Sequence, residues 1–191
     1  MSDATTTPVR ILTLPGWEGA GPDHWQTRWE AVHGDRRVEQ HDWMWPLRGD
    51  WIARLQDVLL QSDVPALLIA HSLGCHLVAA WAAHTRHADR VRAALLVAPP
   101  DLDALDAPQL QSWKPMVRQP LPFTSTVVAG SDDPYARLDH ARALAADWGS
   151  DFINAGPQGH LNAASGLGDW PQGRAHLDAL LRRTAPRTTS P

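Results

Sequence analysis

The sequence predicts an α/β fold, in which helices cover both faces of a mainly parallel β-sheet. Six short apolar runs alternate with segments whose apolar residues recur at helical spacing, and such alternation is typical of strand–helix–strand units. Several of these runs are almost continuously apolar, as expected of parallel strands that are buried on both faces. The length of 191 residues fits one domain, with its core at about residues 8–184.

Five helices are expected among six strands. The first helix begins at 22–23, where Asp23 is the candidate N-cap and Gln26, three residues later, would complete a capping box. Trp25 and Trp29 share one face of this helix because they are four residues apart. The other helices are expected at about 51–59, 73–81, 138–148 and 174–183, and the strands at 9–14, 37–42, 66–70, 93–98, 125–129 and 151–154.

Two segments lack a clear period. Residues 99–122 are rich in proline and too few for a separate cap domain. They are expected to form either a small flap over a pocket or a loop with one helical turn near 109–113. Residues 185–191 are expected to form a flexible tail.

Composition excludes several classes of protein. The formal net charge is −4 and no basic block occurs, so nucleic acid is not an expected partner. No apolar run approaches the ~18 residues that a membrane span needs. No signal peptide is recognised, and no Cys/His spacing indicates a metal site. The single cysteine, Cys75, fits a reducing compartment, so a cytoplasmic protein is expected. With the observations above, no membrane partner, metal or cofactor is expected either.

The five residues Ala70-His71-Ser72-Leu73-Gly74 give the strongest functional signal. They follow an apolar run and open a helical pattern, so Ser72 lies at a sharp bend between a buried strand and a helix. This is the layout of a nucleophile elbow, in which small residues flank the serine because the strand and helix backbones nearly touch. Gly74 meets that requirement, and Ala70 replaces the glycine of the consensus. The alternative is an ordinary turn with a capping serine.

A serine hydroxyl needs a base to take its proton, and the base needs an acid to orient it. In proteins with a nucleophile elbow, the acid and then the histidine come after the serine in the sequence, each on a loop at the carboxyl end of a later strand. Asp133 follows the fifth predicted strand, and Pro134 restricts its backbone. Asp132 is expected only to form the turn. The acid candidate is therefore Asp133.

Three histidines follow the acid along the chain. His140 and His176 lie inside helical patterns, remote from strand ends, whereas His160 follows the last predicted strand directly and stands beside Gly159. The order Ser72, then Asp133, then His160 after three different strands favours a catalytic triad.

An oxyanion hole would complete this chemistry. One donor is expected to be the backbone N–H of Leu73, and the other to come from the glycine-rich loop after the first strand, where Trp17 is preferred and Gly16 is the alternative. The glycine spacing of that loop does not match a dinucleotide- or phosphate-binding motif.

The positions of four further residues near the predicted site indicate their roles. Trp43 and Trp45 follow the second strand, so they either form a wall of the substrate pocket or only pack the loop. His71 is expected to point away from Ser72 along its strand and to be structural. Cys75, one turn into the helix, is expected to be a packed small residue rather than a nucleophile.

Four segments together resemble a family of small serine hydrolases that includes retinoblastoma-binding protein nine and many bacterial proteins. The segments are 12–16, 70–74, 130–134 and 159–162, and the Trp/Pro-rich stretch 41–46 is similar as well. The resemblance covers about residues 9–181. It implies an α/β-hydrolase fold of three layers without a cap domain, the triad Ser72, Asp133 and His160, and activity on small esters.

One member of that family binds the retinoblastoma protein through a Leu-x-Cys-x-Glu motif. The matching segment here, 73–77, ends in Leu77 in place of the acid. No retinoblastoma-type motif is therefore present, and that partner is not expected.

Together these observations predict one sheet with strand order 2-1-3-4-5-6 and a site where that order reverses. The expected function is an esterase-like serine hydrolase that cleaves small-molecule acyl substrates through an acyl-enzyme. A thioesterase or an acyltransferase would use the same residues, and a non-catalytic protein-binding module on the same scaffold is the alternative of another class.

Overall fold

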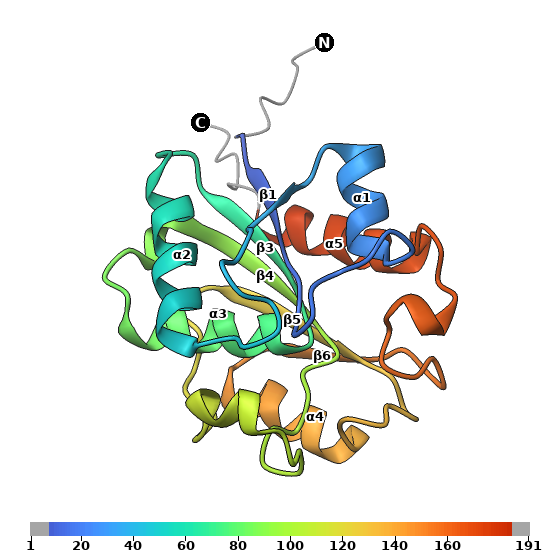
Figure 1. Cartoon of the computed structure of the whole chain (residues 1–191). Helices are drawn as coiled ribbons and strands as arrows, with labels where there is room; N and C mark the ends of the chain where they lie inside the picture. The colour runs from blue at the N-terminus through green and yellow to red at the C-terminus, as the bar shows by residue number, and fades with distance from the viewer. Residues whose placement is uncertain (1–7, 185–191) are drawn as a thin grey trace.

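The strands form one six-stranded parallel sheet in the order β2-β1-β3-β4-β5-β6, as predicted (Figure 1). The computed structural model describes residues 8–184, so the predictions for 1–7 and for the tail at 185–191 lie outside the described residues. The strands are β1 (Arg10–Leu14), β2 (Arg36–Arg37), β3 (Ala66–His71), β4 (Val91–Val97), β5 (Thr124–Ala129) and β6 (Asp151–Asn154).

Helices cover both faces of this sheet (Figure 1). One face packs against α2 (Arg48–Leu60), α3 (Leu73–His84) and α4 (Leu138–Asp147), and the other against α1 (Trp25–His33) and α5 (Pro171–Arg183). Because successive residues of a strand point to opposite faces, Leu68 of β3 packs with the first group and Ile69 with the second. The result is a three-layer structure without a cap domain.

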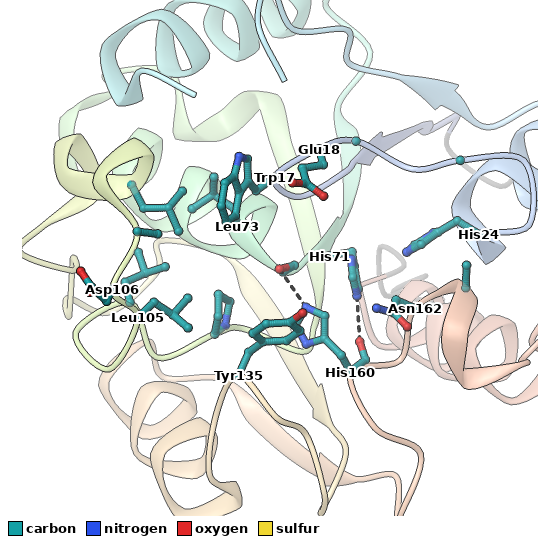
Figure 2. Close-up of a pocket in the computed structure, with 18 residues that line it drawn as sticks. Trp17, Glu18, His24, His71, Leu73, Leu105, Asp106, Tyr135, His160 and Asn162 are labelled. Carbon is teal, nitrogen blue, oxygen red and sulfur yellow. Dashed lines mark hydrogen bonds between the residues drawn. The ribbon is translucent and has the colours of Figure 1, made fainter. Parts of the chain in front are cut away.

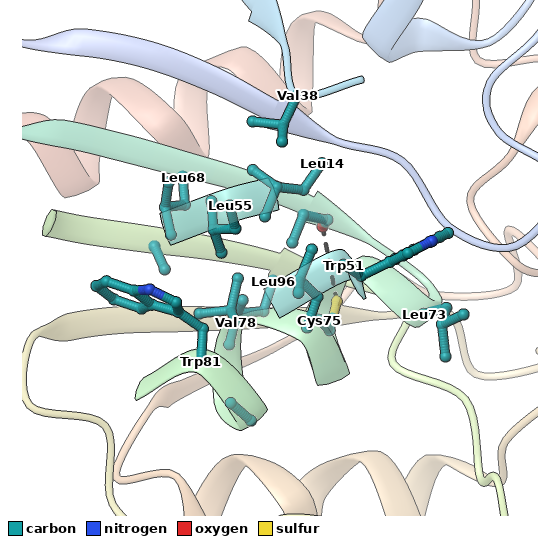
Figure 3. Packing of buried hydrophobic residues seen from close by; sticks show 14 of the residues in the cluster. Leu14, Val38, Trp51, Leu55, Leu68, Leu73, Cys75, Val78, Trp81 and Leu96 are labelled. Atoms are coloured by element: carbon teal, nitrogen blue, oxygen red, sulfur yellow. Dashed lines mark hydrogen bonds between the residues drawn. The ribbon is translucent and has the colours of Figure 1, made fainter. Parts of the chain in front are cut away.

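Indole rings fill much of both layers. Trp51 of α2 and Trp81 of α3 are fully buried in the same hydrophobic cluster as Leu68 and Leu96 of the sheet (Figure 3). On the other face the rings of Trp25 and Trp29 of α1 lie 4.8 Å apart, edge to face. Aromatic rings prefer this geometry, and the α1 pair confirms the shared helix face that their spacing predicts.

Several boundaries differ from the prediction by two or three residues, and the second strand and the first helix differ in ways that bear on the site. The second strand spans only Arg36–Arg37 instead of 37–42, because this edge strand pairs with β1 alone and the chain then turns away. The first helix begins at Trp25, not at 22–23, and its N-cap is His24 in place of Asp23. The Nδ1 atom of His24 accepts a hydrogen bond from the Gln26 backbone N–H at 3.2 Å, as the oxygen of a capping asparagine would.

The proline-rich segment 99–122 is a loop with one 3₁₀ helix at Pro108–Trp113. Shorter 3₁₀ turns occur at Ala88–Arg90 and Ala163–Ser165. Across residues 8–184, every helix is too short or too polar to cross a membrane.

The sheet register brings the ends of three strands to one edge. His71 at the end of β3 pairs with Val97 of β4, Val97 pairs with Val128 of β5, and Ala129 pairs with Asn154 of β6. The loops that follow β3, β5 and β6 therefore start side by side.

Candidate active site

Ser72 occupies the bend between β3 and α3 with a strained backbone. Its φ is 55° and its ψ −123°, a region that residues other than glycine rarely adopt. Its backbone N–H donates to the carbonyl oxygen of Val97 at 2.9 Å, which secures the bend to β4. A Cβ on Gly74 would overlap the carbonyl oxygen of Leu14. The small residue after the serine is therefore required because α3 starts against the end of β1.

The loop after β1 lies directly against Ser72. A Cβ on Gly16 would stand 2.7 Å from the Cβ of Ser72 and 3.2 Å from the backbone nitrogen of Leu73. Leu73 is the first residue of α3, so its N–H has no acceptor within the helix. The loop is held in place because Glu18 N–H donates to the carbonyl oxygen of Trp43, and Trp17 Nε1–H to that of Met44, both at 3.0 Å. Gly16 and the Leu73 nitrogen thus lie beside Ser72, and Trp17 lines the same cavity.

Ser72, His160 and Asp133 form one hydrogen-bonded chain. His160 Nε2 lies 3.0 Å from Ser72 Oγ, and His160 Nδ1 lies 2.8 Å from Asp133 Oδ2. The side chains of His160 and Asp133 are 8% and 2% exposed. The second carboxylate oxygen of Asp133 accepts from the Tyr135 backbone N–H at 2.8 Å. The three residues that the sequence singles out are therefore brought together, with the acid nearly excluded from water.

The loops that carry Asp133 and His160 are joined to each other. Asp132 Oδ1 accepts a hydrogen bond from the Gly159 backbone N–H at 2.7 Å, and a Cβ on Gly130 would overlap the Gly159 carbonyl oxygen. Asp132 is thus more than the turn former that its position indicates, because it fixes the residue before His160.

His71 braces His160 from the other side. Burial lowers the pKa of His71 well below its ordinary value, so its ring is neutral near pH 7. Its Nε2–H can therefore donate to the His160 carbonyl oxygen, 2.9 Å away. The two rings pack edge to face with centroids 4.9 Å apart. His71 has the structural role expected of it, although it lies against the pocket and not away from it.

Cys75 is buried beneath the elbow and is not a nucleophile. Its Sγ lies 3.3 Å from the carbonyl oxygen of Val97, and burial raises the pKa of the thiol far above its ordinary value. It is the packed small residue that the sequence predicts.

A cavity of about 530 Å³ opens at Ser72 and has two chemically different sides (Figure 2). In Figure 2, Leu105 and Asp106 lie at one end, His24 and Asn162 at the other, and His160 lies between them. We call the first side the apolar wall; it consists of Leu73, Pro100, Leu102, Leu105, Ala107 and Leu110. We call the second side the histidine wall; it consists of His24, His71 and His160.

Trp43 and Trp45 lie outside the lining of this cavity. The Trp43 ring packs edge to face on Trp51, with centroids 5.3 Å apart, and Trp45 is 51% exposed. Of the two roles that the sequence leaves open, loop packing is the one that this placement favours. Their segment reaches the site through the backbone carbonyls that hold the Trp17 loop.

Sequence reasoning missed most of the cavity lining. Apart from Leu73, the apolar wall comes from the aperiodic segment 99–122. The Tyr135 ring packs edge to face against that of His160, with centroids 4.6 Å apart, and no sequence motif indicates this contact. The sequence does not indicate that His24 caps α1, because its neighbour Asp23 is of a more usual capping residue type. Within residues 8–184, no cluster of three or more His, Cys, Asp or Glu side chains fits a metal ion.

Comparison with known proteins identifies the family of the chain and its fold. The model of the family described as Serine hydrolase matches residues 11–179. A YdeN-like hydrolase from Pectobacterium atrosepticum superimposes with a TM-score of 0.83 at 23% identity over 93% of each chain. The ydeN gene product of Bacillus subtilis gives 0.72 at 18% identity, over 92% of this chain and all of that one.

More distant structures have the same architecture. The carboxylesterase CesB of Bacillus subtilis gives a TM-score of 0.62 at 14% identity, over 94% of this chain and 85% of that one. At such identities these structures support the fold alone. No curated protein matches the chain by sequence. The family model covers most of the chain, and on that ground the protein belongs to the serine hydrolase family and is an enzyme of the α/β-hydrolase fold.

Proposed function

We propose that the protein hydrolyses carboxylic esters through a covalent acyl-enzyme on Ser72, with His160 as general base and acid and Asp133 as its orienting carboxylate. The observation that carries this proposal is the unbroken chain of 3.0 and 2.8 Å contacts from Ser72 Oγ through the His160 ring to Asp133. Such a chain raises the nucleophilicity of a hydroxyl that is otherwise unreactive.

In the first half of the reaction Ser72 Oγ attacks the ester carbonyl carbon, and His160 Nε2 takes the hydroxyl proton. Asp133 accepts a hydrogen bond from His160 Nδ1–H, which selects the tautomer with a free Nε2 lone pair and stabilises the imidazolium. The backbone N–H groups of Leu73 and of Trp17 or Gly16 would hold the oxyanion, each contributing roughly 3 kcal/mol to transition-state stability. The carbon–oxygen bond then breaks, and His160 returns the proton to the departing alcohol.

In the second half water replaces the alcohol. The water molecule attacks the acyl carbonyl carbon while His160 takes one of its protons. The bond between this carbon and Ser72 Oγ then breaks, and His160 returns the proton to Ser72 Oγ. The products are a carboxylic acid and the regenerated enzyme. These steps are complete with groups of the chain and water alone.

The cavity supports a small acyl substrate. A volume of about 530 Å³ lies in the range of sites that enclose small molecules. The apolar wall offers a surface for a hydrocarbon acyl chain beside the carbonyl that Ser72 attacks. We therefore propose esters of short to medium aliphatic acids as the substrate class.

A fluorophosphonate probe tests the proposal, because it forms a stable bond only to an activated serine. Wild-type protein should be labelled, should turn over p-nitrophenyl butyrate and hexanoate, and should lose both properties in Ser72→Ala. Ser131→Ala is the matched control, since Ser131 is an exposed serine beside the acid loop, and it should behave as wild type. Folded wild-type protein that resists the probe would overturn the proposal and favour a binding role.

A further inference from the structure

His24 is a buried side chain of the cavity with one ring nitrogen unused. The residue is 4% exposed, lines the cavity, and lies in Figure 2 on the side of His71 away from the apolar wall. Within the part of the chain that the structure describes, His24 Nε2 is buried without a hydrogen-bond partner. A buried polar atom normally has such a partner. Because the His24 residue lines the cavity, its unpaired nitrogen points to a ligand.

The cap of α1 determines which chemical group His24 presents. Its Nδ1 accepts the Gln26 backbone N–H at 3.2 Å and therefore carries no proton. Burial also lowers the pKa of His24 to about 4, so the ring is neutral near pH 7 and its one proton is on Nε2. The free hydrogen-bonding group of the His24 side chain is therefore a donor and not an acceptor. Because Nε2 is buried as well as unpaired, a ligand in the cavity meets it only after a small shift of the ring.

The position of this donor indicates which part of the substrate it meets. The alcohol of an ester must leave beside His160, which supplies its proton. The His24 ring packs edge to face against His71, with centroids 4.7 Å apart, and the His71 ring packs in the same way against His160, with centroids 4.9 Å apart. The histidine wall therefore extends from His160, where the alcohol would depart, to His24, whereas Leu105 of the apolar wall lies on the opposite side of His160 (Figure 2).

We propose that the enzyme prefers esters whose alcohol carries a second oxygen, and that His24 Nε2–H donates a hydrogen bond to that oxygen. This specificity rests on the ester hydrolysis proposed above. Asn162 also lines the cavity, and its side-chain oxygen accepts from the Ala164 backbone N–H at 3.0 Å, so its amide N–H is another donor on this side and the His24 variants decide between the two. The reaction itself is unchanged: water enters, the acyl carbon–oxygen bond breaks, and the alcohol departs with the proton from His160.

Two esters of hexanoic acid form the test pair. 2-Methoxyethyl hexanoate carries an ether oxygen where n-butyl hexanoate has a methylene, so their shapes are nearly equal. Acid release is followed in a pH-stat, and the ratio of kcat/KM values is divided by the ratio of hydroxide-catalysed rates to remove the difference in leaving-group reactivity. The wild-type enzyme should prefer the ether ester by about tenfold, the worth of one net hydrogen bond.

Two variants separate the donor from the cap. His24→Asn keeps a side-chain oxygen near Nδ1 that can still cap α1, but it has no donor at the position of Nε2. His24→Gln places an amide N–H near Nε2 and removes the cap. The preference for the ether ester should vanish in His24→Asn and largely persist in His24→Gln. Asp23→Ala is the control, since its exposed neighbouring side chain lies outside the cavity.

The outcomes distinguish this proposal from the one beneath it. Equal loss of both esters in His24→Asn, or no wild-type preference for the ether ester, would show that Nε2–H contacts only the His71 ring and would overturn the specificity. Turnover of both esters that survives in Ser72→Ala would instead overturn the hydrolytic mechanism. Both proposals are supported if turnover requires Ser72 and if the preference for the ether ester is lost in His24→Asn but not in His24→Gln or Asp23→Ala.

Discussion

The two walls of the cavity are built in opposite ways. The histidine wall is formed at strand ends and a helix start, and hydrogen bonds fix its members in place: His71 to the His160 backbone, His160 to Asp133, and His24 to the α1 backbone. The apolar wall comes largely from the irregular segment after β4, and its Leu105 is held by packing. The proposed catalytic groups are therefore positioned mainly by the ends of strands, whereas the proposed acyl site is formed largely by a loop. Substitutions in the two walls should consequently change different kinetic quantities.

The largest effect is expected for the acid. Asp133→Asn leaves the size of the side chain unchanged but removes the charge that selects the His160 tautomer, so kcat should fall about 10⁴-fold. Esterase kinetics with p-nitrophenyl hexanoate measures it. Asp132→Asn is the matched variant, because it retains the oxygen that accepts from Gly159 N–H; a comparable loss there would place the catalytic acid at the wrong residue.

The second-largest effect is expected at the contact between the loop that carries Asp133 and the loop that carries His160. In Gly130→Ala the new methyl group would overlap the Gly159 carbonyl oxygen and push the His160 loop outward. A displacement of about 1 Å can lower kcat by about 10². Gly149→Ala offers a comparison, since Gly149 has open space around it but a φ of 66°, so it should lower stability and leave kcat nearly unaltered. Equal kcat values for Gly130→Ala and wild type would disprove a tight junction.

Buried histidines should make stability depend on pH. Burial lowers the pKa values of His24 and His76 from 6.5 to about 4. Below pH 6.5 the unfolded chain binds protons that the folded chain does not. The stabilisation is therefore complete above pH 6.5 and is lost as pH falls toward 4, at about 1.4 kcal/mol per pH unit for each histidine.

Urea unfolding between pH 5 and 7 measures this slope. His76→Gln keeps a donor for the Pro100 carbonyl oxygen, which lies 2.9 Å from His76 Nε2, and removes one titrating ring. The slope of its unfolding free energy against pH should be smaller by the contribution of one histidine, about 1.4 kcal/mol per pH unit. An identical slope in the variant would mean that His76 takes up its proton in the folded protein.

The smallest effect is expected in the apolar wall. Leu105→Ala should weaken the preference for hexanoate over butyrate, by about fourfold for each methylene that loses its contact. Leu105→Trp should reverse the preference by filling the space. Leu60→Ala, at an exposed site on α2, serves as the control. An unaltered chain-length profile in both Leu105 variants would remove this wall from the acyl site.

The same contrast explains what could be predicted from the sequence. Strand order and the positions of Ser72, Asp133 and His160 follow from apolar runs and the residues just after them, because parallel strands must end at a common edge. The second strand was predicted too long, since nothing local shows that it has a single neighbour. Leu105 and Leu110 join the cavity only through contacts between distant segments, and a segment without a period gives no signal of such contacts.

The single cysteine of the chain gives this elbow a built-in reporter. Because Cys75 Sγ is sealed between α3 and β4, a thiol reagent can reach it only when the helix lifts from the sheet. The modification rate of the native protein then measures how often that happens. A phosphonate attached to Ser72, three residues earlier, should slow the modification of Cys75 if it holds the start of α3 against the loop after β1. The decrease in the modification rate would then measure how strongly the bound phosphonate stabilises this contact.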